Sequence, residues 1–257
     1  MMMSKGKYAE AVKTADLTAR IDSTFPDIHL LGGAALLRMG RYDAATVELE
    51  KEINLHPGRP DAYTDLGTVM LQTGDMDSAR ALALAAIDRR PSDITANRLL
   101  IRATRKDSTA SLTELEQTVQ TALTNTDSNL YVLNEGVEAL VLRGDLSFAE
   151  PLVARGLAVR PPPIETDDLA FGPDFPHAPE RFERERARTY YYHGLLAALR
   201  NHPGVAVTSL SAAIARDSTL AEAYLNLIAV LKASGQFTRA DSVLTTARRL
   251  FPHDQRF

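Results

Sequence analysis

Cysteine is absent from the 257 residues, so disulfide bonds, thiol catalysis, cysteine-ligated zinc and lipid attachment through cysteine are excluded. Tryptophan is absent as well, and aromatic residues make up only 6% of the chain. No apolar run approaches the roughly 18–20 residues that a membrane helix needs. The first residues, MMMSKGKYAEAVK, lack the apolar stretch of a secretory signal. We therefore expect a cytoplasmic protein without a membrane span.

An excess of charge of one sign is also missing. Lys and Arg number 29 and Asp and Glu number 33, so the net charge is −4, and the two signs alternate along the chain. A general binder of nucleic acid would be more basic, so nucleic acid is not expected as a partner. Hydrophobic residues at 45% and charged residues at 24% are ordinary for a folded protein.

A repeat of 34 residues is present near the N-terminus. Glycine recurs with this period at Gly6, Gly40 and Gly74, and it is followed five residues later by Ala11, Ala45 and Ala79. Two later segments keep the same internal spacing from glycine to alanine and to a proline seventeen residues on: Gly144, Ala149 and Pro161, and then Gly235, Ala240 and Pro252. A fixed period of this length is typical of a repeat architecture.

Each repeat is expected to form two helices. Tyr63, Leu66, Gly67 and Met70 share one face of a first helix, and Gly74 ends it. A second helix places further apolar residues on one face, and a proline closes the repeat: Ala79, Leu82, Ala83, Ala86 and Pro91. Small residues at Ala79 and Ala240 would let paired helices touch closely. The large residues that recur with the period are expected in the core: Tyr42, Tyr63, Tyr190, Tyr224 and Phe237.

This pattern resembles the tetratricopeptide repeat family, whose motif is W-x2-L-G-x2-Y, then A-x3-F, then P. Tyr63, Leu66, Gly67 and Met70 follow its first part, with tyrosine in place of tryptophan and methionine in place of tyrosine. The resemblance implies an all-α, right-handed superhelical solenoid of antiparallel helix pairs. It also implies a concave groove, lined by the first helices, that binds segments of partner proteins.

The repeats divide the chain into three parts. Residues 1–163 would hold half a unit and four full units, residues 164–186 a proline-rich inserted loop, and residues 187–257 two further units of the same array. The full units are 26–59, 60–93, 94–129, 130–163, 187–220 and 221–254. In the degenerate unit 94–129, Ser111 and Glu114 form a capping-box pattern. In unit 187–220, Asn201 and Pro203 replace the usual turn.

The inserted loop has three interpretations. It is expected first as an ordered loop that packs Leu169, Phe171 and Phe175 on neighbouring helices, and second as a docking segment or lid over the groove. A metal site is the third, although no recognised ligand spacing is present in Glu165, Asp167, Asp168, Asp174 and His177. Deleting 165–177 is expected to leave the array folded. The helix that follows is expected to begin near Glu180.

Catalytic and cofactor motifs are not found. The chain has no G-x-S-x-G, no phosphate-binding G-x-x-x-x-G-K and no H-E-x-x-H. Its six histidines are scattered, and no acid that would orient His193 can be identified in the sequence. We therefore expect a protein that is not an enzyme, with no catalytic residues, no metal and no cofactor.

Function is expected in the groove. A polar and aromatic patch is predicted on the first helices, at Arg98, Arg102, Asn134, Glu138, Arg188 and Tyr191, and it would suit an acidic partner segment. A solvated helix face is the alternative interpretation of these residues. Chaperone-binding members of the family hold a terminal carboxylate at places that here carry Leu30, Ala34, Asp65, Thr95 and Leu99, so that role is not expected.

The sequence thus predicts a scaffold or adaptor for protein–protein interaction. The alternative is a regulatory or substrate-recruiting domain cut from a larger enzyme, which the missing first helix of the first unit favours. The array has no polar capping helix at either end, so self-association or a required partner is expected. Residues expected on the uncovered terminal faces are Val12, Leu17, Val243 and Leu250.

Overall fold

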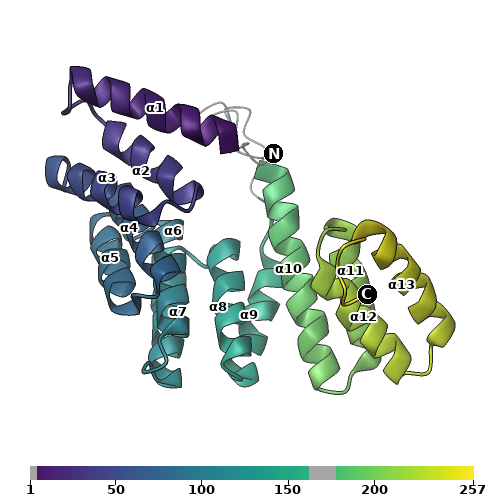
Figure 1. Ribbon diagram of the computed structural model, residues 1–257. Coiled ribbons are helices and arrows are strands. Elements are labelled where there is room, and N and C mark those ends of the chain that lie inside the picture. The colour runs from purple at the N-terminus through teal and green to yellow at the C-terminus, as the bar shows by residue number, and fades with distance from the viewer. Residues whose placement is uncertain (1–4, 162–177) are drawn as a thin grey trace. The chain divides into compact units, whose positions relative to one another are not determined.

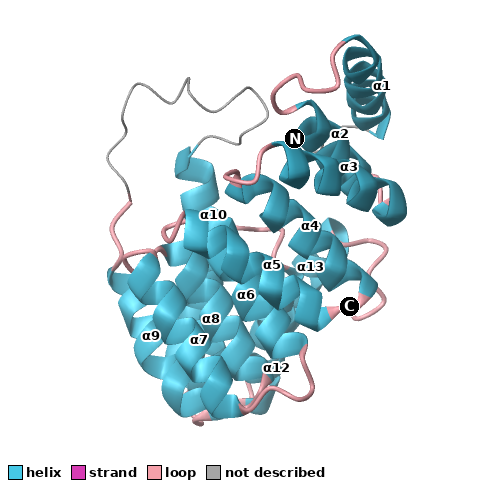
Figure 2. Ribbon diagram, turned by 90° about the vertical axis from the view of Figure 1, so that its left-hand side faces the viewer, coloured by secondary structure: helices cyan, strands magenta, loops and turns pink. Residues whose placement is uncertain are grey.

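The computed structural model describes residues 5–161 and 178–257, and in these ranges every regular element is an α-helix (Figures 1 and 2). The helices are α1 (Lys5–Ile21), α2 (Ile28–Arg38), α3 (Tyr42–Leu55), α4 (Pro60–Thr73), α5 (Met76–Arg89), α6 (Ile94–Lys106), α7 (Leu112–Asn125), α8 (Leu130–Leu142), α9 (Leu146–Ala158), α10 (Ala178–Leu199), α11 (Pro203–Arg216), α12 (Ala221–Ala233) and α13 (Phe237–Leu250). The predicted all-α fold of paired helices is confirmed. The expectations for residues 162–177, including the packed loop, the lid, the metal site and the deletion, lie outside the described residues.

The chain forms two compact units, Met1–Glu135 and Gly136–Phe257, and the division falls inside α8. In the first unit, α2 with α3, α4 with α5, and α6 with α7 are antiparallel pairs in chain order, and α1 packs on α2 (Figure 1). In the second unit, α10 pairs with α11 and α12 pairs with α13. Helix α10 begins at Ala178, close to the predicted start.

The turns between paired helices follow the expected chemistry. Gly74 ends α4 in the left-handed region with φ 92°, where a side chain would strain the backbone. Asn201 takes the same part in the second unit with φ 59°, and Pro203 begins α11. Ser111 accepts a hydrogen bond at its Oγ from the backbone N–H of Glu114 at 3.1 Å, which caps α7 as the capping-box pattern predicts.

Small residues lie where the paired helices touch. Ala45, Ala79 and Ala240 are all fully buried, each in the second helix of its pair. A Cβ added to Gly67 would lie 2.7 Å from Cδ2 of Leu99, so the first helix of one pair also approaches the next pair closely.

Apolar clusters fill the space around these contacts. One cluster joins Leu36, Leu49, Leu66 and Val69 from three helices of the first unit. Another in the second unit joins Leu210, Leu227, Leu231 and Ala240. Each cluster spans successive helix pairs, so a pair buries its apolar face largely against its neighbours.

A buried histidine joins the loop after α1 to α3. His29, 5% exposed, lies 2.7 Å through Nδ1 from Oε2 of Glu48 and 3.0 Å through Nε2 from the carbonyl oxygen of Ser23. The pKa of Glu48 is lowered: burial raises it, but the hydrogen bonds and charges of Lys51 and His29 outweigh that effect. These contacts join the loop after α1 to α2 and α3.

Of the five large residues that recur with the repeat, only some lie in the core. Tyr63 and Tyr224 are buried at 8% and 3% exposure, whereas Tyr42 and Tyr190 are half-buried. The prediction for Phe237 is wrong, since its side chain is 62% exposed. Met76, which has the same place in its repeat, is covered by a cluster that includes Leu99 and Leu100 of the next pair. Phe237 lies in α13, and the structure describes no helix after α13 that would cover it in the same way.

The prediction that four apolar residues lie exposed on the first and last helices is correct for only two of them. Val12 packs against the Leu36 cluster and Val243 against the Leu210 cluster, so neither lies on an uncovered face. Leu17 and Leu250 are exposed, at 50% and 43%. The difference arises because Val12 and Val243 lie on the sides of α1 and α13 that face their neighbouring helices.

Replacing Ala79 by leucine should destabilise the fold. Ala79 is fully buried between paired helices, and overpacking such a site costs about 1–3 kcal/mol. Ala81→Leu, on the same helix but exposed, is the matched control and should change stability by less than about 0.5 kcal/mol. Urea unfolding followed by circular dichroism measures both, and equal midpoints for the two variants would contradict the packing described.

Candidate partner-binding surfaces

The arginines predicted to bind a partner already hold a carboxylate of their own unit. Arg98 donates to Oε2 of Glu135 through Nε at 3.1 Å, and Arg102 donates to the same oxygen through NH2 at 2.6 Å. The Glu135 side chain is 3% exposed, while those of Arg98 and Arg102 are 21% and 41% exposed. Two cations from α6 therefore stabilise one buried anion of α8.

Arg188 has the same kind of role in the second unit. It donates to Glu138 at 2.6 Å and to Glu185 at 3.1 Å, and the Tyr192 hydroxyl also donates to Glu138 at 3.0 Å. Burial lowers the pKa of Arg188, but its interactions with Glu185, the Tyr192 hydroxyl and Glu138 raise it by more, so it stays charged. The pKa of Tyr192 is raised by burial and by the charge of Glu138. These side chains join α10 to α8.

The remaining predicted residues differ in exposure. Asn134 is 1% exposed, so its side chain belongs to the interior of the first unit. Tyr191 is half-buried, accepts a hydrogen bond from Asn226 at 3.3 Å and lies edge-to-face with the Tyr192 ring. Burial, together with the charge of Glu222, raises its pKa. Arg98, Arg102 and Asn134 thus belong to the first unit, and Glu138, Arg188 and Tyr191 to the second.

A cavity of about 470 Å³ lies on the first helices of three successive pairs in the first unit. We call it the α2–α4–α6 groove. Its lining is Asp27, Leu30, Leu31, Ala34, Arg38, Asp61, Thr64, Asp65, Asp93 and Thr95. Leucine and alanine side chains of α2 form its apolar part, and aspartates at the starts of α2 and α6 and along α4 form its polar part. The groove can therefore accept an apolar side chain next to a polar or charged one.

Three of the four aspartates in the groove have arginine partners. Asp27 pairs with Arg59, and Arg90 lies 3.6 Å from Asp61 and 3.1 Å from Asp93. Asp93 also caps α6 by accepting from the N–H of Ala96 at 2.9 Å. Two arginines are thus shared by three aspartates, and both arginine side chains are at least 40% exposed, so these pairs offset only part of the acidic charge of the groove.

Asp65 is the exception. In the part of the chain that the structure describes, no hydrogen bond or ion pair is made by its half-buried carboxylate. Burial raises the pKa of Asp65 from 3.8 to about 6; the charge of Arg38 lowers it, and the charge of Asp61 adds a smaller upward contribution. A carboxylate that is partly removed from water and unpaired costs free energy when it ionises.

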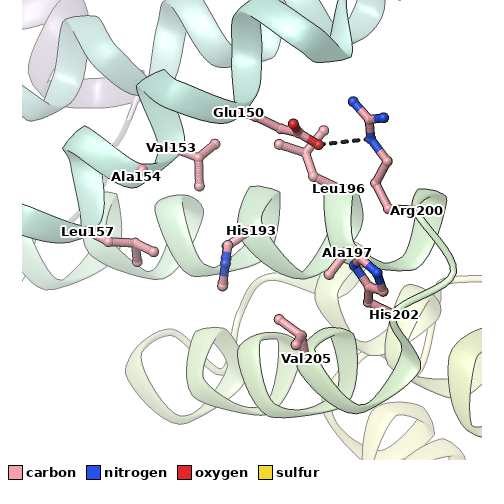
Figure 3. A pocket seen from close by; sticks show the side chains of 10 residues that line it. All are labelled: Glu150, Val153, Ala154, Leu157, His193, Leu196, Ala197, Arg200, His202 and Val205. Carbon is pink, nitrogen blue, oxygen red and sulfur yellow. Dashed lines mark hydrogen bonds and ion pairs between the residues drawn. The ribbon is translucent and has the colours of Figure 1, made fainter.

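The second unit holds a separate pocket of about 420 Å³ between α9, α10 and α11 (Figure 3). Val153, Leu157 and Val205 give it an apolar lining, and the ion pair of Glu150 with Arg200 crosses one side at 2.8 Å. His193 points into it from α10 and lies 2.8 Å through Nδ1 from Oγ of Ser209.

Sequence reasoning missed the Ser209 contact and the importance of Asp65. The contact joins two helices and has no sequence signal. Asp65 did have one, because Asp61 and Asp65 are like charges four residues apart on one helix face, an arrangement that destabilises a helix.

Glu135→Gln should destabilise the first unit. The substitution leaves two arginines without their buried anion, and the loss of charge-assisted hydrogen bonds costs about 2 kcal/mol. Glu150→Gln is the control, because it breaks an ion pair in which both side chains are more than 40% exposed, worth less than about 1 kcal/mol. Chemical unfolding measures both, and an equal effect of the two substitutions would contradict a structural role of Glu135.

Asp65→Asn should stabilise the protein above pH 6 and have little effect near pH 3.5. The pKa of Asp65 is raised in the fold, so its ionisation destabilises the fold as the pH rises from 3.8 through about 6. Solvent screening limits the gain to about 1 kcal/mol at pH 8. Unfolding curves at both pH values test this, and a gain that does not depend on pH would contradict the electrostatic cause.

Comparison with known proteins supports the repeat. The tetratricopeptide repeat model matches residues 36–102, from the end of α2 into α6. No curated protein matches the chain. No helix in the described ranges combines the length and apolar character that crossing a bilayer needs.

Solved structures share the fold at low identity. One from the functional characterisation of PilF of Pseudomonas aeruginosa is 15% identical, with a TM-score of 0.63 over 90% of this chain and 93% of that one. A chain of the APC/C hetero-tetramer Cut9–Hcn1 is 13% identical, with a TM-score of 0.66 over 98% of this chain and 44% of that one. The C-terminal part of a TPR repeat-containing protein from Cytophaga hutchinsonii is 15% identical, with a TM-score of 0.58 over 97% of this chain and 92% of that one. The chain therefore resembles tetratricopeptide repeat proteins, in sequence over residues 36–102 and in fold over most of its length.

Proposed function

We propose that this protein is a scaffold that binds a segment of a partner protein along the first helices of its repeats. The observation that carries the proposal is the α2–α4–α6 groove, to which three successive repeats each contribute one helix. A groove shared by several repeats can hold an extended or helical segment longer than one repeat could bind. One structural neighbour, Cut9, was solved in a hetero-tetramer, which agrees with this kind of role.

A catalytic role is not proposed. The pair of His193 and Ser209 is the nearest approach to a nucleophile and base in the described residues. The carboxylate that lines the same pocket, Glu150, is held by Arg200 instead of orienting His193. In the part of the chain that the structure describes, no carboxylate orients His193, and a serine and a histidine without an orienting group are an incomplete acyl-transfer centre.

Two finer parts of the proposal concern other surfaces. Binding of an acidic partner segment through Arg98, Arg102, Arg188 and Tyr191 stays a prediction, and such a segment would compete with Glu135 and Glu138 for the arginines. Self-association through the first and last helices also stays a prediction, and exposed Leu17 and Leu250 would carry it.

The test removes the apolar part of the groove. Leu31 is 49% exposed and lines the groove with Ala34, so Leu31→Gln with Ala34→Gln should leave the helices intact while removing apolar contact with a partner. The losses of apolar contact should sum to about 1.4 kcal/mol, which is a tenfold loss of affinity. Quantitative affinity capture with mass spectrometry compares this variant with Leu84→Gln, an exposed leucine of α5 outside the groove.

Partners that are captured by the Leu84→Gln control and lost by the groove variant would support the proposal. Arg102→Gln in the same series tests the arginine surface without introducing a negative charge beside Glu135. A set of captured proteins that is the same in all variants would show that partner binding uses neither surface.

A further inference from the structure

The lining of the α2–α4–α6 groove is more acidic than basic, with four aspartates and one arginine. Its four aspartates lie near three arginines, of which Arg59 holds Asp27 and Arg90 holds Asp61 and Asp93. The third, Arg38, lines the groove but makes no ion pair with Asp65. Asp65 is therefore the one carboxylate of the groove lining that makes no ion pair in the described residues.

The apolar part of the groove lies beside this carboxylate. Leu30, Leu31 and Ala34 come from α2, and α2 packs directly on α4, which carries Asp65. Leu31 is 49% exposed although large and apolar. An occupant that fits both parts must present an apolar group and a cation within one or two residues of each other.

Resting on the proposed scaffold function, we propose that the α2–α4–α6 groove binds a partner segment with a lysine or arginine that pairs with Asp65 and an adjacent apolar side chain that packs on Leu30, Leu31 and Ala34. Charge complementarity selects this occupant, because a cation pairs with the unpaired Asp65, whereas an acidic segment would be repelled by that carboxylate. The cavity of about 470 Å³ has room for such a pair of side chains.

The energetics of Asp65 agree with a binding role. A desolvated, unpaired carboxylate destabilises the free protein, and a bound cation removes that cost. Residues that lower stability and lie in a groove are typical of sites kept for binding. The Arg98 and Arg102 surface is different, because its cations are already satisfied by Glu135.

The experiment selects binders to the full chain from a phage-displayed library of random linear peptides. Selected peptides should be enriched in lysine or arginine next to leucine, isoleucine or phenylalanine. One arginine-containing peptide without acidic residues or histidine is then synthesised, together with its citrulline counterpart, which keeps the shape of arginine without its charge. Fluorescence anisotropy measures both against the wild type, Asp65→Asn and the control Asp88→Asn, whose aspartate is exposed on α5.

Binding of the arginine peptide should weaken at least tenfold with Asp65→Asn, and binding to the wild type should weaken at least tenfold with citrulline. Asp65→Asn should bind the citrulline peptide no more weakly than either single change alone, because both changes remove the same contact. Asp88→Asn should bind like the wild type. The affinity of the wild type should also fall about tenfold from pH 7 to pH 5, as protons compete with the cation for a carboxyl whose pKa is about 6. Asp65→Asn keeps the other charged groups that line the groove, so its pH profile should be flat: Asp27 just before α2, Arg38 of α2, Asp61 of α4 and Asp93 just before α6.

The outcomes separate the two proposals. Peptides that bind the wild type and Asp65→Asn equally, or that are enriched in acidic residues and bind through Arg102, would overturn the basic-segment inference and leave the scaffold function standing. A selection that returns no peptide that binds the chain would count against both.

Discussion

Close contact between the paired helices is the constraint on which the rest of the structure depends. Fully buried alanines such as Ala79 and Ala240 let the second helix of a pair approach the first, and glycines such as Gly67 let the next pair approach in turn. Because the helices approach so closely, large side chains such as Leu49 and Leu210 fill the spaces between successive pairs. The groove follows from this packing, since it places the first helices of neighbouring repeats side by side.

Charge has two different roles on the first helices. The buried carboxylate of Glu135 requires Arg98 and Arg102, and Glu138 shares Arg188 with Glu185, so these ion pairs join helices within each unit. In the α2–α4–α6 groove the balance is incomplete, and Asp65 keeps a charge that destabilises the free protein. A surface that is fully neutralised favours folding, whereas one that retains an unpaired charge beside apolar side chains favours a partner.

The sequence predicted the helices well because the signals for them are local. Glycine at Gly74, asparagine at Asn201 and the Ser111 cap act through their own turn of backbone, so their positions are sufficient to locate the helix ends. Periodicity also identified Ala79, Tyr63 and Tyr224 as core residues. It was wrong for Phe237, because a residue with the core period is buried only if a neighbouring helix covers it.

By itself, the sequence determined the helical repeat, its turns and the small residues at the helix contacts, since each depends on a period or on backbone conformation within a few residues. Only the tertiary structure decided which charged side chains are satisfied. Arg98 and Glu135 are 37 residues apart, and no local rule pairs them. Arg102 is paired with Glu135 and Asp65 has no ion pair, because the fold brings a carboxylate to the first group and no cation close enough to the second.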